Sequence, residues 1–169
     1  LDLDMPMPTL HRLLLTLESH GFVRQSKSDA TWSIGIEAFR VGSAFPRAAK
    51  LLSIARPVLK DLSGRTGETA NLGIMDLGEV IFIAQHETHH AIRAFFRPGS
   101  RGSWHSSGIG KVIAAYIAIT DQKTLFEKAP LEQFTQNTIV QEQELLEEFN
   151  RIRAVGYSVD KEERFIGMR

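Results

Sequence analysis

The chain has 169 residues, 43% of them hydrophobic, and its 20 Lys and Arg residues balance 20 Asp and Glu residues. It contains no cysteine, which excludes a disulfide framework and a thiolate zinc site. No apolar run approaches the roughly 18–20 residues needed to span a bilayer, and no secretory signal opens the sequence, so we expect a cytoplasmic protein without a membrane partner.

The first predicted element is a helix over residues 8–20. Leu10, Leu13, Leu14 and Leu17 recur at the spacing i, i+3, i+4, i+7, which is typical of one buried helix face. Pro6 and Pro8 suit the entry and first turn of a helix, where a missing N–H does no harm. Gly21 can adopt the left-handed conformation that ends the helix, so that Phe22 folds back onto Leu17.

A short hairpin follows this helix. Residues 22–24 and 31–34 are rich in β-forming side chains and flank a polar turn at residues 26–29. A helix followed at once by a hairpin is the back half of a winged helix-turn-helix. The side chains that we expect to contact DNA lie on the polar part of the helix and in the hairpin turn: Thr9, His11, Arg12, Thr16 and Lys27.

The alternative for this helix is a solvated face without a partner. The charge of this segment does not favour binding to DNA or to another polyanion, because residues 1–40 carry four basic and five acidic side chains. Binding would therefore depend on geometry, on helix ends and on the avidity of a dimer.

The middle of the chain predicts two helices and three strands. Ile36, Phe39 and Phe45 indicate a short linker helix ending at Pro46, and the apolar spacing over residues 47–62 predicts an amphipathic helix, kinked at Pro57. Residues 69–75 and 80–85 read as strands joined by a tight turn at Asp76-Leu77-Gly78. Residues 91–96 read as a third strand, and residues 98–103 as a flexible loop.

The last third predicts two more helices and a strand. Residues 108–118 are apolar nearly all round, including Tyr116, which marks a buried helix. Thr138 and Gln141 form a capping box for a helix that buries Leu145, Phe149 and Ile152 and ends at Gly156. Residues 157–160 begin a further strand. This mixture predicts an α+β domain with an antiparallel sheet flanked by helices.

The sharpest candidate for a binding site is the run Ser106-Ser107-Gly108-Ile109-Gly110. A serine cap and two glycines leave backbone N–H groups free at the positive end of a buried helix, which suits one carboxylate of a small metabolite. The alternative is that the serine only caps the helix while the glycines pack. Trp104 and His105 lie just before this run, either as an aromatic lid or as a packed core pair.

Two other kinds of site are weaker. Four histidines and a glutamate are candidate metal ligands: His86, Glu87, His89, His90 and His105. Their spacing does not place the histidines on one face of a strand, which argues against a metal site. Residues of the types in a catalytic triad are present, but no G-x-S-x-G elbow, P-loop or dinucleotide fingerprint occurs. We therefore expect no metal, no cofactor and no enzymatic activity.

Several motifs resemble the IclR family of bacterial transcriptional regulators. They are, in chain order, Pro6 to Leu14, Gly21-Phe22-Val23, Val41 to Ala44, Ala55 to Leu59, Thr66 to Thr69, His105 to Lys111 and Gly156 to Asp160. The order and spacing follow the family over essentially the whole chain. Met7 and Pro8 depart from the basic residue and the serine that are common there, which removes two phosphate contacts.

The resemblance implies a GAF-like effector domain whose pocket includes Ala91, Gly108, Ile109 and Asp160, with Ser107 beside them. In family members the positions of Gly108 and Ile109 touch small 2-oxo acids. Asp160 would accept a hydrogen bond from a ligand hydroxyl. The alternative is a carboxylate paired with Arg153 or Lys161.

We therefore interpret the chain as a ligand-responsive transcriptional regulator that binds operator DNA and a small carboxylic acid such as a 2-oxo acid, as a homodimer or tetramer. Residues 1–35 would be an N-terminally incomplete winged helix-turn-helix, residues 36–46 a linker helix, and residues 47–169 a C-terminally incomplete effector domain. The competing hypothesis is a stand-alone metabolite-binding module whose helix and hairpin form a dimerisation arm.

Overall fold

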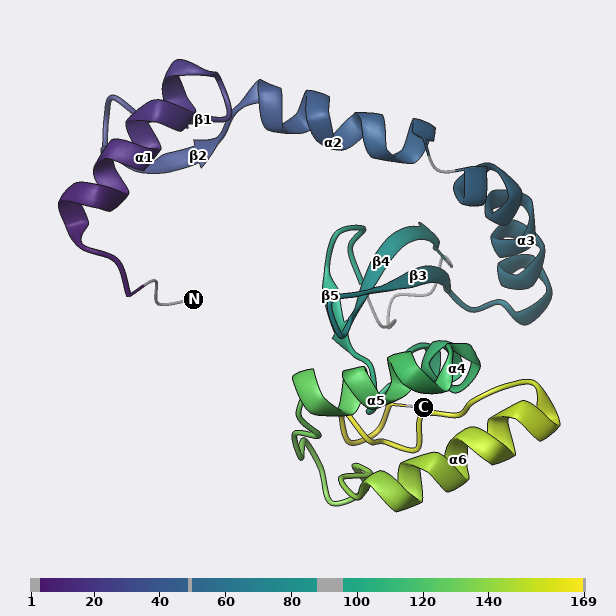
Figure 1. The fold of residues 1–169 in the computed structure, drawn as a ribbon. Coiled ribbons are helices and arrows are strands. Elements are labelled where there is room, and N and C mark those ends of the chain that lie inside the picture. Colours follow the sequence, from purple (N-terminus) through teal and green to yellow (C-terminus); the bar gives the residue numbers. More distant parts are fainter. Residues whose placement is uncertain (1–3, 49, 88–95, 169) are drawn as a thin grey trace. The chain divides into compact units, whose positions relative to one another are not determined.

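The computed structural model describes residues 4–48, 50–87 and 96–168. The chain divides into two compact units, Leu1–Ser53 and Ile54–Arg169 (Figure 1). Helices and short antiparallel sheets occur in both units, so the predicted α+β class is confirmed. Within the described residues, no helix is long and apolar enough to cross a membrane.

The first unit begins with helix α1 (Met7–Ser19), which ends as the sequence predicts. Gly21 has φ +74°, the Phe22 N–H donates to the Leu17 carbonyl at 2.9 Å, and the Gly21 N–H donates to the Glu18 carbonyl at 2.8 Å. This pair of bonds is a Schellman motif, which satisfies two carbonyls at the helix end. It turns the chain directly into the hairpin.

The hairpin pairs β1 (Val23–Gln25) with β2 (Trp32–Ile34) in antiparallel register. Glu18 fastens it to α1, because its Oε1 accepts the Gln25 N–H at 2.8 Å. Gly35 is buried where the chain leaves β2, and a Cβ there would lie 2.1 Å from the Gly21 carbonyl oxygen. Only glycine fits this close backbone approach.

The apolar face of α1 is less buried than the leucine spacing predicts. None of its residues is buried, and Leu13 and Leu17 are 46% and 42% exposed. The physical reason is size, because a hairpin with three residues in each strand cannot cover a helix of 13 residues. The chain then continues into α2 (Ile36–Ala48), which extends past Pro46, where the sequence predicted its end.

The second unit contains most of α3 (Lys50–Thr66) and a three-stranded antiparallel sheet in the order β3-β4-β5. As predicted, β3 (Ala70–Asp76) and β4 (Glu79–His86) are joined by a two-residue turn. Leu77 and Gly78 both have positive φ, +48° and +82°, as a type I′ turn requires.

The third strand of this sheet, β5 (Arg101–Ser103), lies in the segment predicted to be a flexible loop. Gly102 explains the error, because a Cβ there would lie 3.1 Å from the Phe82 ring, so the glycine lets β5 approach β4. The strand predicted over residues 91–96 falls almost wholly outside the described residues, and Phe96 itself is not in a strand.

Three helices build the core beside this sheet (Figure 1). Helix α4 (Gly108–Tyr116) lies against β3 and β4, and α6 (Glu142–Val155) packs on the side of α4 away from the strands. Helix α5 (Ile119–Lys128) was not predicted. Buried side chains of these helices and of the segment before α4 form the core: Trp104, Ala114, Ala115, Leu125, Leu145, Phe149 and Ile152.

Several details of this half differ from the prediction. Tyr116 is 61% exposed, whereas Lys111 is buried on the inner face of α4. Thr138 does not cap α6; its hydroxyl accepts the Phe134 and Thr135 N–H groups and donates to the Glu163 carbonyl. Residues 157–160 form no strand, because their backbone follows α4 and a tight turn instead of a sheet edge. Gly156 ends α6 with φ +84°, as predicted.

Candidate effector-binding and DNA-binding sites

The start of α4 has the geometry of a helix cap with free donors. Ser107 is extended (φ −136°, ψ 147°), and its Oγ accepts the Gly110 N–H at 3.1 Å while its hydroxyl donates to the Ser103 carbonyl at 2.6 Å. The Gly108 and Ile109 N–H groups have no acceptor among the described residues. Two donors at the positive end of a helix can therefore receive an anion.

The sheet fixes the position of this helix end. A Cβ on Gly73 of β3 would lie 2.8 Å from Ile109 Cδ1, so the absence of a side chain at Gly73 makes room for Ile109. The side chain of Ile109 thus packs on the sheet.

Asp160 comes to the same place from the far end of the chain. A Cβ on Gly108 would lie 3.5 Å from both the Asp160 nitrogen and the Ser158 carbonyl oxygen, so the 158–160 backbone passes directly over Gly108. Asp160 pairs with neither Arg153 nor Lys161 among the described contacts. Its Oδ1 accepts the Glu163 N–H at 2.8 Å, whereas Arg153 donates to the Ala115 carbonyl.

Ser107 and Asp160 line one small cavity of about 110 Å³, which we call the Asp160 cavity. Its other walls are aromatic, apolar or cationic side chains and the backbone of β5: Phe82, Phe96, Arg101, Gly102, Ser103, Arg164, Phe165 and Met168. Phe82 and Phe96 stack with ring centroids 4.5 Å apart. The cavity therefore combines a helix N-terminus, two guanidinium groups, one carboxylate and an aromatic wall.

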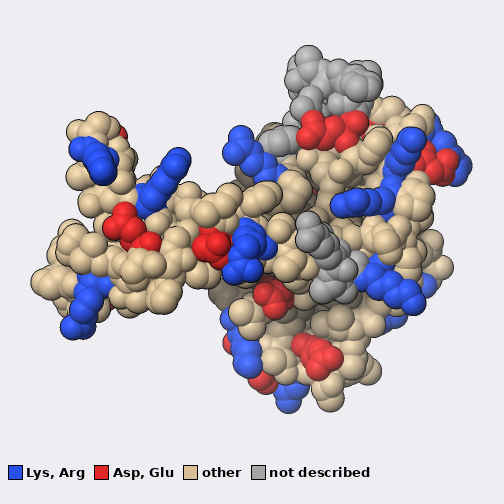
Figure 2. Space-filling view, turned by 90° about the horizontal axis from the view of Figure 1, so that it is seen from above, with Lys and Arg blue, Asp and Glu red and all other residues tan. Residues whose placement is uncertain are grey.

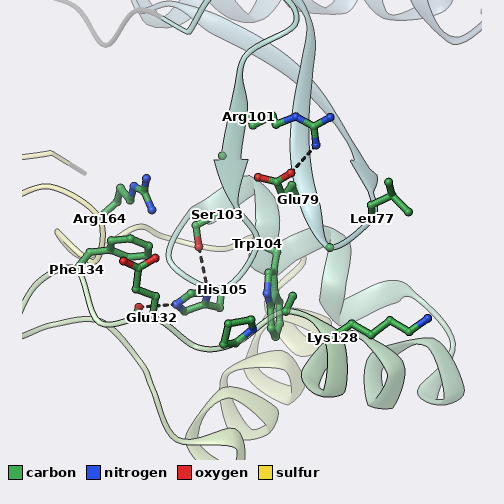
Figure 3. Close-up of a pocket in the computed structure, with 14 residues that line it drawn as sticks. Leu77, Glu79, Arg101, Ser103, Trp104, His105, Lys128, Glu132, Phe134 and Arg164 are labelled. Atoms are coloured by element: carbon green, nitrogen blue, oxygen red, sulfur yellow. Dashed lines mark hydrogen bonds and ion pairs between the residues drawn. The ribbon is translucent and has the colours of Figure 1, made fainter. Parts of the chain in front are cut away.

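Trp104 and His105 line a different cavity of about 380 Å³, the Trp104 cavity, shown in Figure 3. The two cavities share Arg101, Gly102, Ser103 and Arg164, so β5 forms the wall between them. Trp104 and His105 are each only 2% exposed, and Trp104 belongs to the core. This placement is that of a packed pair, and it separates both residues from Asp160.

Both ring nitrogens of His105 have hydrogen-bond partners (Figure 3). Its Nε2 lies 2.9 Å from the Glu132 carbonyl oxygen, which can only accept, so Nε2 carries the proton and Nδ1 accepts from the Ser103 hydroxyl at 3.1 Å. Burial lowers the pKa of His105 below its usual value, an effect that the Glu132 carbonyl partly opposes.

The remaining expected ligand residues and the metal hypothesis can be placed only in part. Ala91 lies outside the described residues, as do His89 and His90. No group of three His, Cys, Asp or Glu residues suited to a metal ion occurs within the described part of the chain. Sequence reasoning missed Phe82, Phe96 and Arg164 as cavity residues, because nothing in their local pattern marks them.

The candidate DNA-binding residues are displayed on α1 and the hairpin turn. Thr9, Arg12 and Thr16 share one face at the spacing i, i+3, i+7, and His11 is rotated by ~100° from Arg12. His11, Arg12, Thr16 and Lys27 are exposed, and Thr9 is half-buried. The Thr16 hydroxyl donates to the Arg12 carbonyl at 2.9 Å, so toward DNA it can serve as an acceptor.

Residues 1–40, which include these side chains, carry four basic and five acidic residues. On the face shown in Figure 2, Lys and Arg side chains are interspersed with Asp and Glu side chains. This agrees with the zero net charge of the chain and with the equal numbers of basic and acidic residues.

A helix and wing followed by an α+β domain is an organisation found in a class of proteins, the bacterial transcription regulators. Comparison with known families agrees. The model of the bacterial transcriptional regulator IclR C-terminal domain matches residues 46–169, and that of the IclR helix-turn-helix domain matches residues 2–27. The chain belongs to the IclR family of bacterial transcriptional regulators.

Individual relatives support this. The HTH-type transcriptional regulator BhcR of Paracoccus denitrificans is 46% identical over 99% of this chain and 60% of its own length. The Thermotoga maritima IclR crystal structure has a TM-score of 0.75 at 32% identity, over 97% of this chain and 66% of that one. The inducer-binding domain of Acinetobacter PobR, a double mutant solved with 3-hydroxybenzoic acid, has a TM-score of 0.62 at 26% identity, over 70% of each chain. The chain thus spans about 60% of the length of BhcR.

Proposed function

We propose that this chain belongs to a ligand-responsive regulator of transcription that acts in the cytoplasm, and that its effector is a small carboxylic acid of the 2-oxo acid class. The observation that carries the proposal is that Asp160 and Ser107 line one cavity, and that Ser107 caps a helix whose next two N–H groups, at Gly108 and Ile109, have no acceptor among the described residues.

The donors favour a carboxylate. Two N–H groups at a helix start carry partial positive charge, and Arg164 adds a guanidinium that has no carboxylate partner among the described ion pairs. Its guanidinium carbon lies 3.8 Å from the centre of the Phe134 ring, which lines the Trp104 cavity, and 5.7 Å from the centre of the Phe165 ring, which lines the Asp160 cavity. Asp160 would accept from a hydroxyl or hydrate at the far end of the ligand.

The cavity also limits the size of the ligand. At about 110 Å³ it is smaller than the ~150 Å³ cavity that can hold benzene. A two- or three-carbon acid therefore fits better than an aromatic acid. The 3-hydroxybenzoic acid in the PobR domain supports the chemical class, a carboxylic acid, but not the size.

The first experiment is a calorimetric titration with glyoxylate and pyruvate, the two smallest 2-oxo acids, and with acetate and 3-hydroxybenzoate as controls. We expect the oxo acids to bind more tightly than either control. No binding by either oxo acid would refute the proposed effector class.

The role of the free N–H donors at the start of α4 is tested by Gly108→Pro, with Gly108→Ala as the matched control. Gly108 is the first residue of α4, where proline is tolerated, and Ser107 already has the extended backbone that precedes proline. The proline removes one N–H donor, so the affinity should fall by about 1.5–3 kcal/mol, the scale of a charge-assisted hydrogen bond. Alanine keeps the donor and should bind nearly as the parent does. Equal affinities in both variants would move the carboxylate elsewhere.

The DNA-binding half of the proposal rests on α1 and its wing. We propose that Thr9, His11, Arg12, Thr16 and Lys27 contact operator DNA, and that a homodimer or tetramer supplies two such units for two half-sites. A gel shift with DNA from upstream of the gene separates this function from that of a stand-alone metabolite-binding module, which would leave the DNA unshifted. Light scattering that gives only the monomer mass would contradict the oligomer.

A further inference from the structure

The second unit contains a buried ion pair that neither the core nor the proposed ligand contacts explain. Lys111 of α4 and Glu163 are 1% and 2% exposed, and Lys111 Nζ contacts Glu163 Oε1. Removing two charges from water costs several kcal/mol per ion, and a well-packed apolar pair of similar size is often at least as stable. The pair therefore requires a reason other than stability.

The location of the pair supplies a reason. Lys111 lies one turn below the free donors of α4, and its own N–H donates to the Ser107 carbonyl at 3.0 Å. Its Nζ also donates to the Val159 carbonyl at 3.0 Å, the residue just before Asp160. A single ammonium group thus joins α4 to the backbone that carries Asp160.

Glu163 completes the connection from the other side. Its N–H donates to Asp160 Oδ1 at 2.8 Å, and its Oε1 accepts the Lys161 N–H at 3.3 Å, so residues 159–163 form a closed turn, which we call the Asp160 turn. Thr138 donates to the Glu163 carbonyl at 2.6 Å and anchors the turn at its far end.

We propose that Lys111 and Glu163 are positioning residues for effector binding, which set the distance between the Asp160 carboxylate and the N-terminus of α4. This inference rests on the proposed effector site. A ligand that spans the two ends binds tightly only if their separation is fixed beforehand, because ordering the Asp160 turn on binding would subtract from the affinity. Neither Lys111 nor Glu163 lines the Asp160 cavity, so both act through Asp160.

The test is the double variant Lys111→Met/Glu163→Met, which replaces the ion pair by apolar side chains. Glu148, whose Oε1 lies 3.9 Å from Lys111 Nζ, keeps its ion pair with Arg151, so no charge is left unpaired. We expect a melting temperature near that of the parent and a glyoxylate affinity lower by about tenfold, the scale on which partners that orient a binding group act. Hydrogen exchange of the backbone amide at position 163 in the ligand-free variant should become faster than in the parent, because the turn is no longer held on α4.

Arg153→Met is the matched control, since Arg153 also donates to a carbonyl of α4, that of Ala115, but at the opposite end of the helix. It should leave the glyoxylate affinity unchanged. If the double variant does not fold, Glu163→Gln keeps the size and the acceptor for Lys111, and it should lower the glyoxylate affinity by a smaller factor in the same direction.

The outcomes distinguish the two proposals. A folded double variant that binds glyoxylate as the parent does, or whose backbone amide at position 163 exchanges at the parental rate, overturns the positioning role and leaves the effector site intact. A parent protein that binds neither glyoxylate nor pyruvate overturns the effector site and the positioning role with it.

Discussion

Two glycines in the first turn of α4 should respond in opposite ways to the same added methyl group. A Cβ on Gly110 would lie 2.3 Å from the Trp104 carbonyl oxygen and 2.5 Å from the Trp104 Cα. These atoms are backbone and cannot rotate away. A Cβ on Gly108 would meet its nearest neighbours at 3.5 Å, an ordinary contact.

The magnitudes follow from these contacts. Gly110→Ala forces the Trp104 backbone to move by about 1 Å in a segment held by the core, and such overpacking should cost at least about 3 kcal/mol. Gly108→Ala creates no overlap and removes chain entropy from the unfolded state, which should stabilise the protein by up to about 0.5–1 kcal/mol.

Thermal unfolding of the two variants beside the parent measures this difference. We expect Gly110→Ala to lower the melting temperature by on the order of 10 °C, and Gly108→Ala to leave it equal or slightly higher. A Gly110→Ala variant with the melting temperature of the parent would show that α4 does not lie against the Trp104 backbone. The proposed geometry of anion binding at the N-terminus of α4 would then be wrong as well.

Other substitutions test separate parts of the molecule. Arg12→Ala should weaken operator binding in a gel shift without changing the melting temperature, because Arg12 is exposed and lies on the polar face of α1; unchanged DNA affinity would remove it from the interface. Phe149→Ala, at a residue with 0% exposure, should cost about 3–5 kcal/mol in urea unfolding; a cost below 1 kcal/mol, roughly that of a surface change, would contradict a tight core. Burial lowers the pKa of His105, so the unfolded chain binds more protons than the folded chain as the pH falls. The stability contributed by the neutral ring is therefore present above the usual pKa of about 6.5 and is lost as the pH falls below it. The His105→Gln variant should show a smaller change of melting temperature between about pH 7 and 5 than the parent, and parallel profiles would refute this.

The parts of the fold that sequence reasoning predicted are those with local causes. Gly21 ends α1, and Leu77-Gly78 turns β3 into β4, because each turn needs a positive φ at a particular residue. Leu145, Phe149 and Ile152 are all fully buried, as their helical spacing predicts.

The errors have non-local causes. Arg101-Gly102-Ser103 has the composition of a loop and becomes β5 only because β4 is there to pair with it. Lys111 was not predicted to be buried, since its partner Glu163 is 52 residues away in the sequence.

The candidate site was predicted in the same uneven way. The cap at Ser107 and the glycines after it are a local pattern, and the structure shows the predicted cap together with unused donors. Asp160 was placed by family resemblance, and its contact with Glu163 replaces the pairing with Arg153 or Lys161 that the sequence suggested. Phe96 and Arg164 come to the cavity by folding alone, so no spacing could indicate them.

The two sides of the Asp160 cavity differ in what holds them, and this difference predicts where a bound effector would act. Helix α4 is fixed along its length, by Ile109 against Gly73 at one end and by buried Ala114 and Ala115 toward the other. The Asp160 turn has no regular secondary structure and is fastened mainly through side chains. A ligand that bridges the two should therefore stiffen the turn further and leave α4 in place, since a packed helix cannot shift without disrupting the core. We expect effector-induced protection from hydrogen exchange to be greatest in residues 157–164 and small along α4, and the opposite distribution would show that the signal leaves the cavity through the helix.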